Sequence, residues 1–267
     1  MMEPVQSSEG CVSLDQKDLI AYITLNNPGR LNAMRLSMWR GLAETCEALK
    51  SSKIRVVIIK GSGARAFSAG ADVSEFPQVR STPKDISSYN AMVARALQSL
   101  AALPMPVIAV VRGHCIGGGL EIALRCDLRL AADTAQFAFT PAKLGLAVGT
   151  EEIAALAHIA GPAAAAELLY TARPVPAERA ERWGLVNQSF PSDLLEDEAA
   201  RIADTVASNA PLTLRAVKAG LRAFSRPGDK DAARHAESLV ETCYASADYR
   251  EGQAAFAAKR RPVFQGH

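Results

Sequence analysis

The stretch PVIAVVRGHCIGGGLEIALRC, residues 106–126, decides the fold of this chain. Residues 106–111 are apolar and mostly β-branched, which predicts a buried strand, whereas the spacing from Leu120 onward predicts a helix. Between them, the glycines at 117–119 let the backbone approach a ligand closely and leave the first helical N–H groups unpaired. Glu121 follows in the first helical turn. This arrangement predicts polarisation of a substrate oxygen and general acid/base chemistry, although it is also compatible with a Glu that only complements the helix dipole.

A second glycine-rich loop repeats the arrangement. Residues 54–59 form a continuous apolar strand, and GSGARAFSAGAD, residues 61–72, follows it. If this strand and strand 106–111 are parallel neighbours, both turns lie at the sheet edge where α/β proteins bind ligands, and each can donate one N–H to the same oxygen. The glycines superficially match a dinucleotide fingerprint. However, no helix opens at the pyrophosphate position and no acidic residue ends a following strand, which argues against a nicotinamide cofactor.

The composition is that of an ordinary globular protein. The 267 residues carry a formal net charge of +2, with 49% hydrophobic and 22% charged residues, which gives no support for a nucleic-acid partner. The five cysteines and four histidines are scattered without disulfide or metal-ligand spacing, so we expect no metal and a reducing, cytoplasmic location. No apolar run reaches the roughly 20 residues that a membrane span needs, so we expect no membrane partner.

Hydrophobic spacing divides the chain into parts. We expect a disordered leader over residues 1–10, alternating strands and helices over residues 11–191, and helices over residues 192–267. Residues 74–84 contain two prolines and polar side chains, so we expect a mobile linker there.

Six fragments, in order, resemble the crotonase superfamily, the enoyl-CoA hydratase/isomerase family, over essentially the whole chain. They are NNPGRLNAM (26–34), AFSAGADVSEF (66–76), VIAVVRGHCIGGGLEIALRCDLRLA (107–131), AQFAFTPAKLGL (135–146), ARPVPAERAERWGLVN (172–187) and DYREGQAAFAAKRRPVF (248–264). The resemblance implies an α/β fold of the ClpP/crotonase type, a spiral of ββα units whose C-terminal helical region packs the subunits into trimers or dimers of trimers. It also implies an acyl-CoA substrate and no cofactor besides the CoA that the substrate carries.

The resemblance also assigns roles to particular residues. The N–H groups of Ala71 and Gly118 are the expected donors that stabilise an enolate oxygen, and Glu121 is the expected acid/base. The residues expected to bind CoA or the acyl group are Ala69, Gly70, Asp72, Val73, Thr140 and Lys259. Lys259 lies in a short basic cluster, so it is equally an ordinary solvated lysine in another interpretation.

The chain departs from the family at one catalytic position. The best-known hydratases use two glutamates, of which one matches Glu121, but Pro141 occupies the position of the other. Glu151 and Glu152 are candidates for a second carboxylate that comes from a different direction. Their alternative role is to complement a helix N-terminus capped by Thr150.

Several reactions therefore stay open. The favoured prediction is hydration of a 2-trans-enoyl-CoA to a 3-hydroxyacyl-CoA, with Glu121 serving as both base and acid. A double-bond isomerase is one alternative. A decarboxylase of the methylmalonyl-CoA type is another, although Ala71 and Val148 stand where those enzymes have His and Tyr. The alternative from another class is a CoA-thioester-binding protein with little or no activity.

Overall fold

A six-stranded sheet forms the centre of the computed structural model, which describes residues 10–267. The sheet has the order β1-β2-β3-β5-β7-β10, and the expected leader lies outside the described residues except for Gly10. Strands β1 and β2 form the predicted antiparallel hairpin, and every other neighbouring pair is parallel. The strands are β1 (Cys11–Lys17), β2 (Ile20–Asn26), β3 (Val56–Gly61), β5 (Val107–Val111), β7 (Leu128–Ala132) and β10 (Gln188–Phe190).

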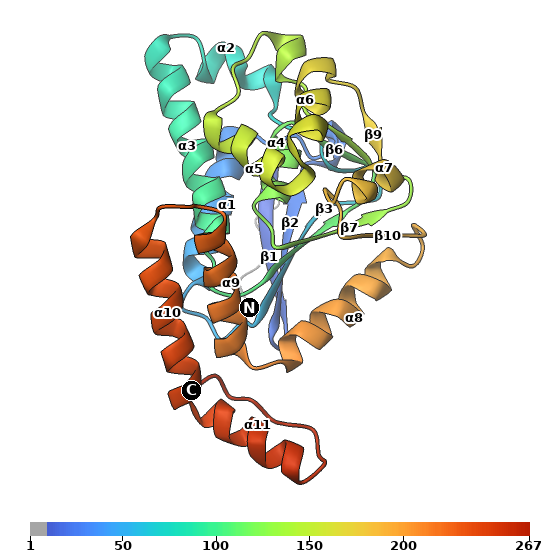
Figure 1. The fold of residues 1–267 in the computed structure, drawn as a ribbon. Coiled ribbons are helices and arrows are strands. Elements are labelled where there is room, and N and C mark those ends of the chain that lie inside the picture. Colours follow the sequence, from blue (N-terminus) through green and yellow to red (C-terminus); the bar gives the residue numbers. More distant parts are fainter. Residues whose placement is uncertain (1–9) are drawn as a thin grey trace.

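Both faces of this sheet are buried, which explains the continuous apolar runs of β3 and β5. Val57 and Ile59 belong to a large core that includes residues of α1 (Leu36–Leu49) and α3 (Pro83–Ala101). The alternate residues Val56 and Ile58 pack against α8 (Leu195–Ser208) on the other face. Figure 1 shows α8 on one side of the strands and α1 with α3 on the other. Because successive strand residues point to opposite faces, a strand covered on both sides is apolar at every position.

Each of the two glycine-rich stretches contains a short strand that belongs to a second sheet. Its order is β4-β6-β8-β9, and its strands are β4 (Ala66–Ser68), β6 (His114–Ile116), β8 (Gln136–Ala138) and β9 (Val175–Pro176). The predicted parallel pairing of residues 54–59 with 106–111 is confirmed by β3 and β5. The expectation that the donor turns directly follow these strands is wrong, because the chain first forms β4 and β6, which pair in parallel. These strands have three residues each, too few to show a hydrophobic period.

Residues 73–79 and 83–101 are helical, so most of the expected mobile linker over residues 74–84 has regular structure. A short 3₁₀ turn, η2 (Val73–Glu75), leads into α2 (Phe76–Val79), and α3 begins at Pro83. Pro77 and Pro83 each lie in the first turn of a helix, where the missing N–H removes no hydrogen bond. Thr82 and Asp85 form a capping box at the start of α3. The prolines that suggested a linker therefore begin two helices.

The remaining helices lie before the C-terminal region and connect the strands of the two sheets. They are α4 (Gly118–Leu124), η3 (Pro141–Leu144), α5 (Thr150–Ala160), α6 (Pro162–Thr171) and α7 (Ala177–Arg182), and η1 (Pro28–Arg30) follows β2. The N-cap of α5 is Gly149 and not Thr150, which is the first helical residue. Among residues 10–267, no helix combines the length and apolar character that a membrane crossing requires.

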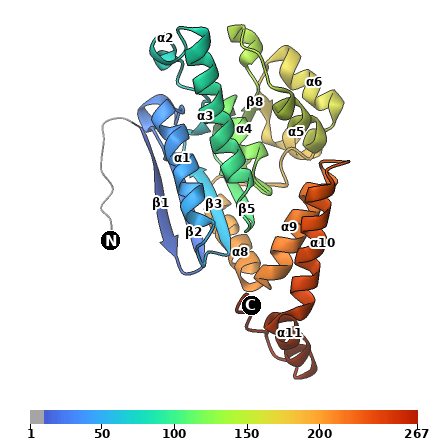
Figure 2. The same ribbon diagram turned by 90° about the vertical axis from the view of Figure 1, so that its left-hand side faces the viewer.

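The last helices extend away from this body. Helices α9 (Pro211–Phe224) and α10 (Lys230–Ala245) pack side by side, and α11 (Ala247–Ala257) follows at the end of the molecule farthest from α2 (Figure 1; Figure 2). Lys218 anchors α9 to the sheet, with its Nζ 2.6 Å from Oδ2 of Asp127 and 2.8 Å from the carbonyl of Met105. Helices cover most of residues 195–257, with breaks at residues 209–210, at residues 225–229 and at Ser246, and the last ten residues are not helical.

Candidate active site

The N–H of Ala71 is available for a ligand because of how the neighbouring segment pairs with it. Met34 forms an isolated parallel bridge with Ala71. In this bridge the N–H of Met34 donates to the carbonyl of Gly70 at 2.7 Å, and the N–H of Asp72 donates to the carbonyl of Met34 at 2.9 Å. Both hydrogen bonds use residues that flank Ala71. The N–H of Ala71 makes no hydrogen bond with any other residue between 10 and 267.

The N–H of Gly118 lies beside it, at the start of α4. A Cβ added to Gly70 would lie 3.3 Å from the Gly118 nitrogen, and a Cβ added to Gly118 would lie 3.5 Å from the Ala71 nitrogen. Gly70 also has a φ of +98°, which side chains disfavour. As the first residue of the helix, Gly118 has no carbonyl one turn earlier within α4 to accept its N–H. Two unpaired donors therefore face a shared space that only glycines leave open.

A buried asparagine holds the loop that carries Met34. Asn32 is 1% exposed and has a positive φ of 56°. Its Nδ2 donates to the carbonyls of Ser62 at 2.9 Å and Ala66 at 2.8 Å, while its Oδ1 accepts from the N–H of Asn27 at 3.0 Å. These hydrogen bonds tie the 27–34 loop to the turn between β3 and β4. The position of Ala71 thus depends on a segment almost forty residues earlier.

Glu121 projects from the first turn of α4, one turn beyond the donors. Its backbone N–H donates to the carbonyl of Gly117 at 2.9 Å, and its carboxylate makes no hydrogen bond within the described part of the chain. The pKa of Glu121 is raised to about 7, mainly by burial and also by the nearby carboxylate of Glu152, while Arg125 lowers it. A carboxyl group with a pKa near 7 exchanges protons readily at neutral pH.

Of the two candidates for a second carboxylate, the structure brings Glu152 to the site. Glu152 Oε1 lies 3.2 Å from Nη2 of Arg125, and its side chain is 20% exposed. The Glu151 side chain is 65% exposed and its Oε2 lies 3.9 Å from the same nitrogen. Since Glu152 raises the pKa of Glu121, the two carboxylates are electrostatic neighbours. Glu151 keeps only the role of an acid in the first turn of α5.

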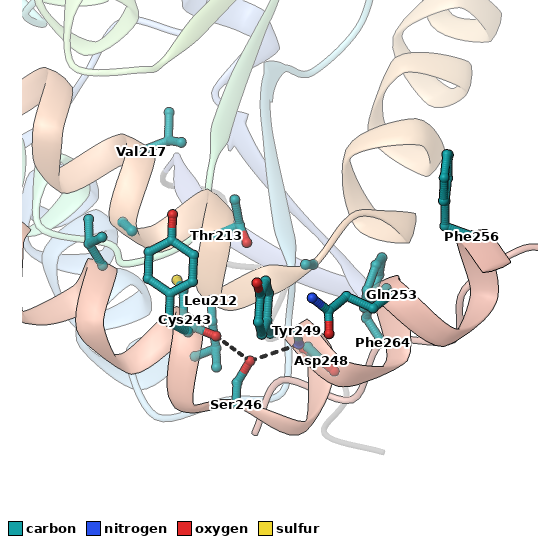
Figure 3. A pocket seen from close by; sticks show the side chains of 15 residues that line it. Leu212, Thr213, Val217, Cys243, Ser246, Asp248, Tyr249, Gln253, Phe256 and Phe264 are labelled. Atoms are coloured by element: carbon teal, nitrogen blue, oxygen red, sulfur yellow. Dashed lines mark hydrogen bonds between the residues drawn. The ribbon is translucent and has the colours of Figure 1, made fainter.

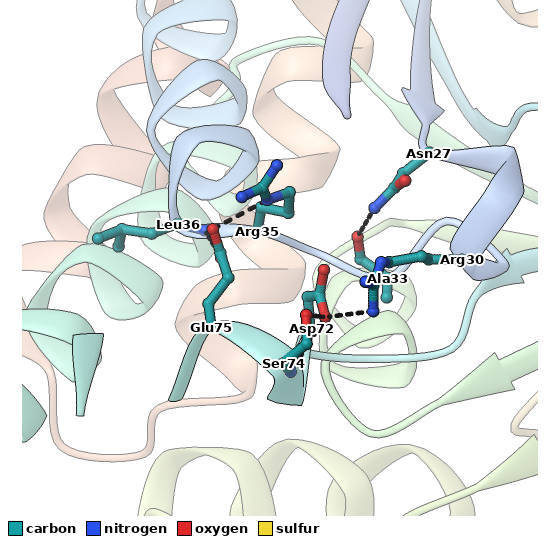
Figure 4. Close-up of polar contacts among 8 residues, drawn as sticks. All are labelled: Asn27, Arg30, Ala33, Arg35, Leu36, Asp72, Ser74 and Glu75. Carbon is teal, nitrogen blue, oxygen red and sulfur yellow. Dashed lines mark hydrogen bonds and ion pairs between the residues drawn. The ribbon is translucent and has the colours of Figure 1, made fainter. Parts of the chain in front are cut away.

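Most of the residues expected to bind CoA lie close together in the sequence directly after β4, where Figure 4 shows Asp72 beside Arg30 and Ser74. The N–H of Ala69 donates to the carbonyl of Leu31 at 2.9 Å, and Val73 is 50% exposed. Asp72 is buried, and its Oδ1 accepts from the hydroxyl of Ser74 at 2.7 Å and lies 3.6 Å from Nη1 of Arg30. Its carboxylate thus caps η2 and holds the loop.

Thr140 lies near the other candidate residues, whereas Lys259 lies far from them. The Oγ1 of Thr140 lies 3.8 Å from the point where a Cβ of Gly117 would be, so Thr140 borders the glycine turn. Lys259 follows α11, which Figure 1 and Figure 2 place at the end of the molecule away from α4. Within one chain, the structure therefore does not bring Lys259 to the other candidate residues.

Sequence reasoning missed several residues of the site. Trp39 of α1 lies against the turn, since its Cζ2 is 3.0 Å from a Cβ added to Gly118. The charge of Glu121 raises the pKa of Tyr89 in α3. Arg125 pairs with Glu152 and lowers the pKa of Glu121. Arg30, with a side chain 59% exposed, adds a cation beside Asp72. The spacing Glu121-x-x-x-Arg125 on a helix was the one available signal; the other residues have ordinary core or surface patterns. No group of three His, Cys, Asp or Glu side chains able to hold a metal ion occurs in residues 10–267.

Fold and site together define an α/β protein in which two unpaired backbone N–H groups lie one helical turn from a carboxyl group with a raised pKa. The sequence profile described as enoyl-CoA hydratase/isomerase matches residues 15–267, and the chain belongs to this family. The short-chain-enoyl-CoA hydratase of Clostridium acetobutylicum is 31% identical over 94% of this chain and 95% of its own. The methylmalonyl-CoA decarboxylase of Escherichia coli is 32% identical over 93% and 95%.

A solved structure with the same fold is described as an enoyl-CoA hydratase/carnithine racemase from Magnetospirillum magneticum. It superposes with a TM-score of 0.90 at 39% identity and covers 96% of each chain. The predicted family, the crotonase-type α/β fold and the hydratase-like enzyme class are thereby confirmed.

Proposed function

We propose that this protein hydrates a 2-trans-enoyl-CoA to the 3-hydroxyacyl-CoA, using the N–H groups of Ala71 and Gly118 as oxyanion donors and Glu121 as the acid/base. The observation that carries the proposal is the pair of unpaired N–H groups next to a buried carboxyl group whose pKa is about 7. The donors polarise the thioester carbonyl, which makes C3 of the conjugated double bond electrophilic. Such donors in a water-poor site stabilise the charged transition state by about 3–4 kcal/mol each.

The reaction proceeds by addition of one water across C2 and C3. Ionised Glu121 removes a proton from the water as its oxygen forms a bond to C3, and the electrons of the double bond move onto the thioester oxygen. The resulting enolate is held by Ala71 and Gly118. Protonated Glu121 then returns its proton to C2, which restores the carbonyl and the starting carboxylate.

Glu152, on α5, supports this chemistry from a position different from that of the second glutamate of the best-known hydratases. Pro141, which replaces the second glutamate, begins the 3₁₀ turn η3 and carries no proton-transfer group. Glu152 keeps the pKa of Glu121 high and is itself held by Arg125. We therefore assign to Glu152 a positioning and electrostatic role, and leave proton transfer to Glu121.

Binding of CoA uses the exposed side of the loop after β4. Val73 is exposed and Ala69 is half-buried there, the buried Gly70 keeps the backbone close, and Arg30 adds a cation for a phosphate group. Lys259 reaches a CoA phosphate only from a second copy, because α11 lies far from α4 in its own chain. The proposed reaction needs no cofactor other than the CoA of the substrate, and we propose that the protein is cytoplasmic.

A homotrimer, or a pair of trimers, fits the C-terminal helices. Helices α9, α10 and α11 line an apolar groove of about 720 Å³ (Figure 3), and three of its lining residues, Val217, Tyr244 and Phe256, are 52%, 66% and 88% exposed. Large apolar side chains in one patch mark an interaction surface. A second copy of the same chain would cover them and bring its own Lys259 toward the CoA site.

The first test follows the absorbance of the conjugated thioester after purified protein is mixed with crotonyl-CoA. We expect the wild type to remove the absorbance and Glu121→Gln to lose turnover by about 10²–10⁴-fold while it still binds CoA thioesters. Equal kcat/KM in both proteins would remove Glu121 from the mechanism. Absence of turnover in the wild type, with acyl-CoA binding intact, would favour a binding role.

Decarboxylation of a methylmalonyl-type CoA ester is the second candidate. Its support is the 32% identical decarboxylase together with Pro141, because loss of CO₂ requires an enolate to be stabilised but no second carboxylate. The same assay with methylmalonyl-CoA, read as CO₂ release, separates the two reactions. Release that survives Glu121→Gln would favour decarboxylation over hydration.

A further inference from the structure

Two polar side chains beside the glycine turn are buried without a hydrogen-bond partner. They are the indole N–H of Trp39 and the hydroxyl of Tyr89, in side chains that are 1% and 4% exposed. Among residues 10–267, no other buried side-chain nitrogen or oxygen is unpaired in this way. Such groups are rare because they lose their hydrogen bonds to water and gain none in return. A pair of them at one place requires an explanation.

Both groups lie next to the reacting centre. Cζ2 of Trp39 is 3.0 Å from the position of a Gly118 Cβ, and Gly118 carries one of the two oxyanion donors. Burial raises the pKa of Tyr89, the indole N–H of Trp39 opposes this, and Glu121 raises it further. Trp39 of α1 therefore lies against the glycine turn, and Trp39 and Glu121 of α4 are both close enough to Tyr89 of α3 to influence its pKa.

The two groups do not satisfy each other. The indole N–H is close enough to favour an ionised phenol, but the pair does not meet the distance and angle of a hydrogen bond. Trp offers only a donor, so even a shorter Trp39–Tyr89 contact would leave the proton of the phenol without an acceptor. At least one of these donors, and in the present geometry both, can therefore donate a hydrogen bond to a ligand.

Packing holds the Tyr89 ring in this position. The Phe76 ring meets it edge to face with centroids 6.0 Å apart, and Cζ of Arg80 lies 5.0 Å from its centroid. The charged groups that influence the phenol are Arg80, Glu75 and Glu121. Two of these three are carboxylates, so a ligand that brings another full negative charge is disfavoured. A neutral oxygen atom suits two donors in such surroundings.

We propose that Trp39 and Tyr89 select acyl chains that carry a neutral oxygen atom, a hydroxyl or keto group, beyond C3 of the 2-enoyl-CoA. This inference rests on the proposed function and specifies its substrate class. An alkyl chain leaves both buried donors unpaired, whereas an oxygen on the chain accepts from one or both. A site built to hydrogen-bond a substrate group discriminates strongly against the analogue that lacks it.

The test compares kcat/KM for hex-2-enoyl-CoA with that for 5-oxohex-2-enoyl-CoA and 6-hydroxyhex-2-enoyl-CoA. We expect the wild type to prefer at least one oxygenated substrate by about tenfold or more. Tyr89→Phe, which removes one oxygen atom and keeps the ring, should lower kcat/KM for the oxygenated substrates by about tenfold more than kcat/KM for hex-2-enoyl-CoA. Tyr22→Phe, in β2 on the α8 side of the sheet, is the matched control and should keep the preference.

Three results would overturn the inference. One is equal turnover of alkyl and oxygenated substrates by the wild type. Another is an equal loss on all substrates in Tyr89→Phe, with a lower unfolding temperature, which would show a purely structural hydroxyl. The third is a preference for 5-carboxypent-2-enoyl-CoA that depends on Tyr89, which would show recognition of a carboxylate.

A binding measurement distinguishes failure of this inference from failure of the proposed hydration. Calorimetric titration with hexanoyl-CoA and 5-oxohexanoyl-CoA requires no turnover. Tighter binding of the oxo compound that is lost in Tyr89→Phe supports the inference even if no hydration occurs. Equal affinities in the wild type would contradict it even if crotonyl-CoA is hydrated.

Discussion

Glu152 Oε1 lies 3.2 Å from Nη2 of Arg125, and Arg125, the C-cap residue of α4, is one helical turn beyond Glu121. Arg125 thus pairs with a carboxylate of α5 close to the carboxylate of Glu121. Glu152 raises the pKa of Glu121, and Arg125 lowers it. Burial is the largest cause of the raised pKa, and this pair, neither member of which lies in the glycine motif, adjusts it.

The pH dependence of hydration should report this balance. Because Glu121 must be ionised to activate water, kcat/KM should fall about tenfold per pH unit below a pKa of about 7 and be constant above it. Glu152→Gln should move this fall to lower pH, and Arg125→Met should move it to higher pH. Glu151→Gln, at an exposed side chain, is the control and should leave the profile in place. Profiles that coincide in all four proteins would show that Arg125 and Glu152 do not tune Glu121.

Glu121 should also make the folded protein less stable as the pH rises. Its pKa is about 7 in the folded chain against 4.5 for the free group, so its favourable contribution is complete below pH 4.5 and is lost as the pH rises through 7. Glu121→Gln should therefore raise the free energy of unfolding at pH 8.5 by up to about 3 kcal/mol. The gain should shrink at pH 5.5. Urea unfolding of both proteins at the two pH values measures it, and a gain independent of pH would contradict the assigned pKa.

Gly118→Ala should reduce turnover more than stability. The added methyl group would lie 3.0 Å from Cζ2 of Trp39 and 3.5 Å from the Ala71 nitrogen, in the space that the substrate oxygen needs. Loss of one oxyanion donor costs about 10²–10³-fold in kcat. Gly41→Ala in α1 is the control, since its Cβ would meet only Val12, at 3.7 Å, and it should keep full activity. Wild-type kcat in Gly118→Ala would exclude this turn from the oxyanion site.

Asn32→Ala should destabilise the fold and disorder the Ala71 donor. The substitution leaves the carbonyls of Ser62 and Ala66 without their donor and puts Ala at a positive φ of 56°. We expect a loss of about 2–4 kcal/mol in the free energy of unfolding. Thermal or urea unfolding measures the loss. A change of less than about 0.5 kcal/mol, the usual effect of a surface substitution, would show that the loop does not depend on Asn32.

Leu221→Asp should separate the proposed oligomer into monomers. Leu221 is 63% exposed on α9, where a charge would be buried against a second copy at considerable cost. Sedimentation velocity of the wild type should give a trimer or a pair of trimers, and the variant should sediment as a single chain. Arg182→Asp, at an exposed position on α7, is the control for an added charge. A wild type that sediments as a single chain would contradict the proposal directly.

The sequence by itself indicated the two apolar strands, the glycine turn, the position of Glu121 and the family. Each of these depends on a local signal: an apolar run, residues without a Cβ, or a carboxylate at a fixed distance from them. Hydrophobic spacing likewise predicted helices in the C-terminal region. The prolines at 77 and 83 were misleading, because the same residue type interrupts a helix and begins one.

Only the tertiary structure decided which other groups meet at the site. The N–H of Ala71 is free because Met34 pairs with its two neighbours, and this pairing depends on Asn32, which bonds across thirty residues of sequence. Glu152 rather than Glu151 faces Glu121 because α5 packs against α4 in one orientation. Trp39 and Tyr89 have the spacing of core residues, and their unpaired donors become visible only when every neighbouring acceptor has been placed. Contacts between distant segments leave no local pattern in a single sequence, and they determine which charged and polar groups meet at this site.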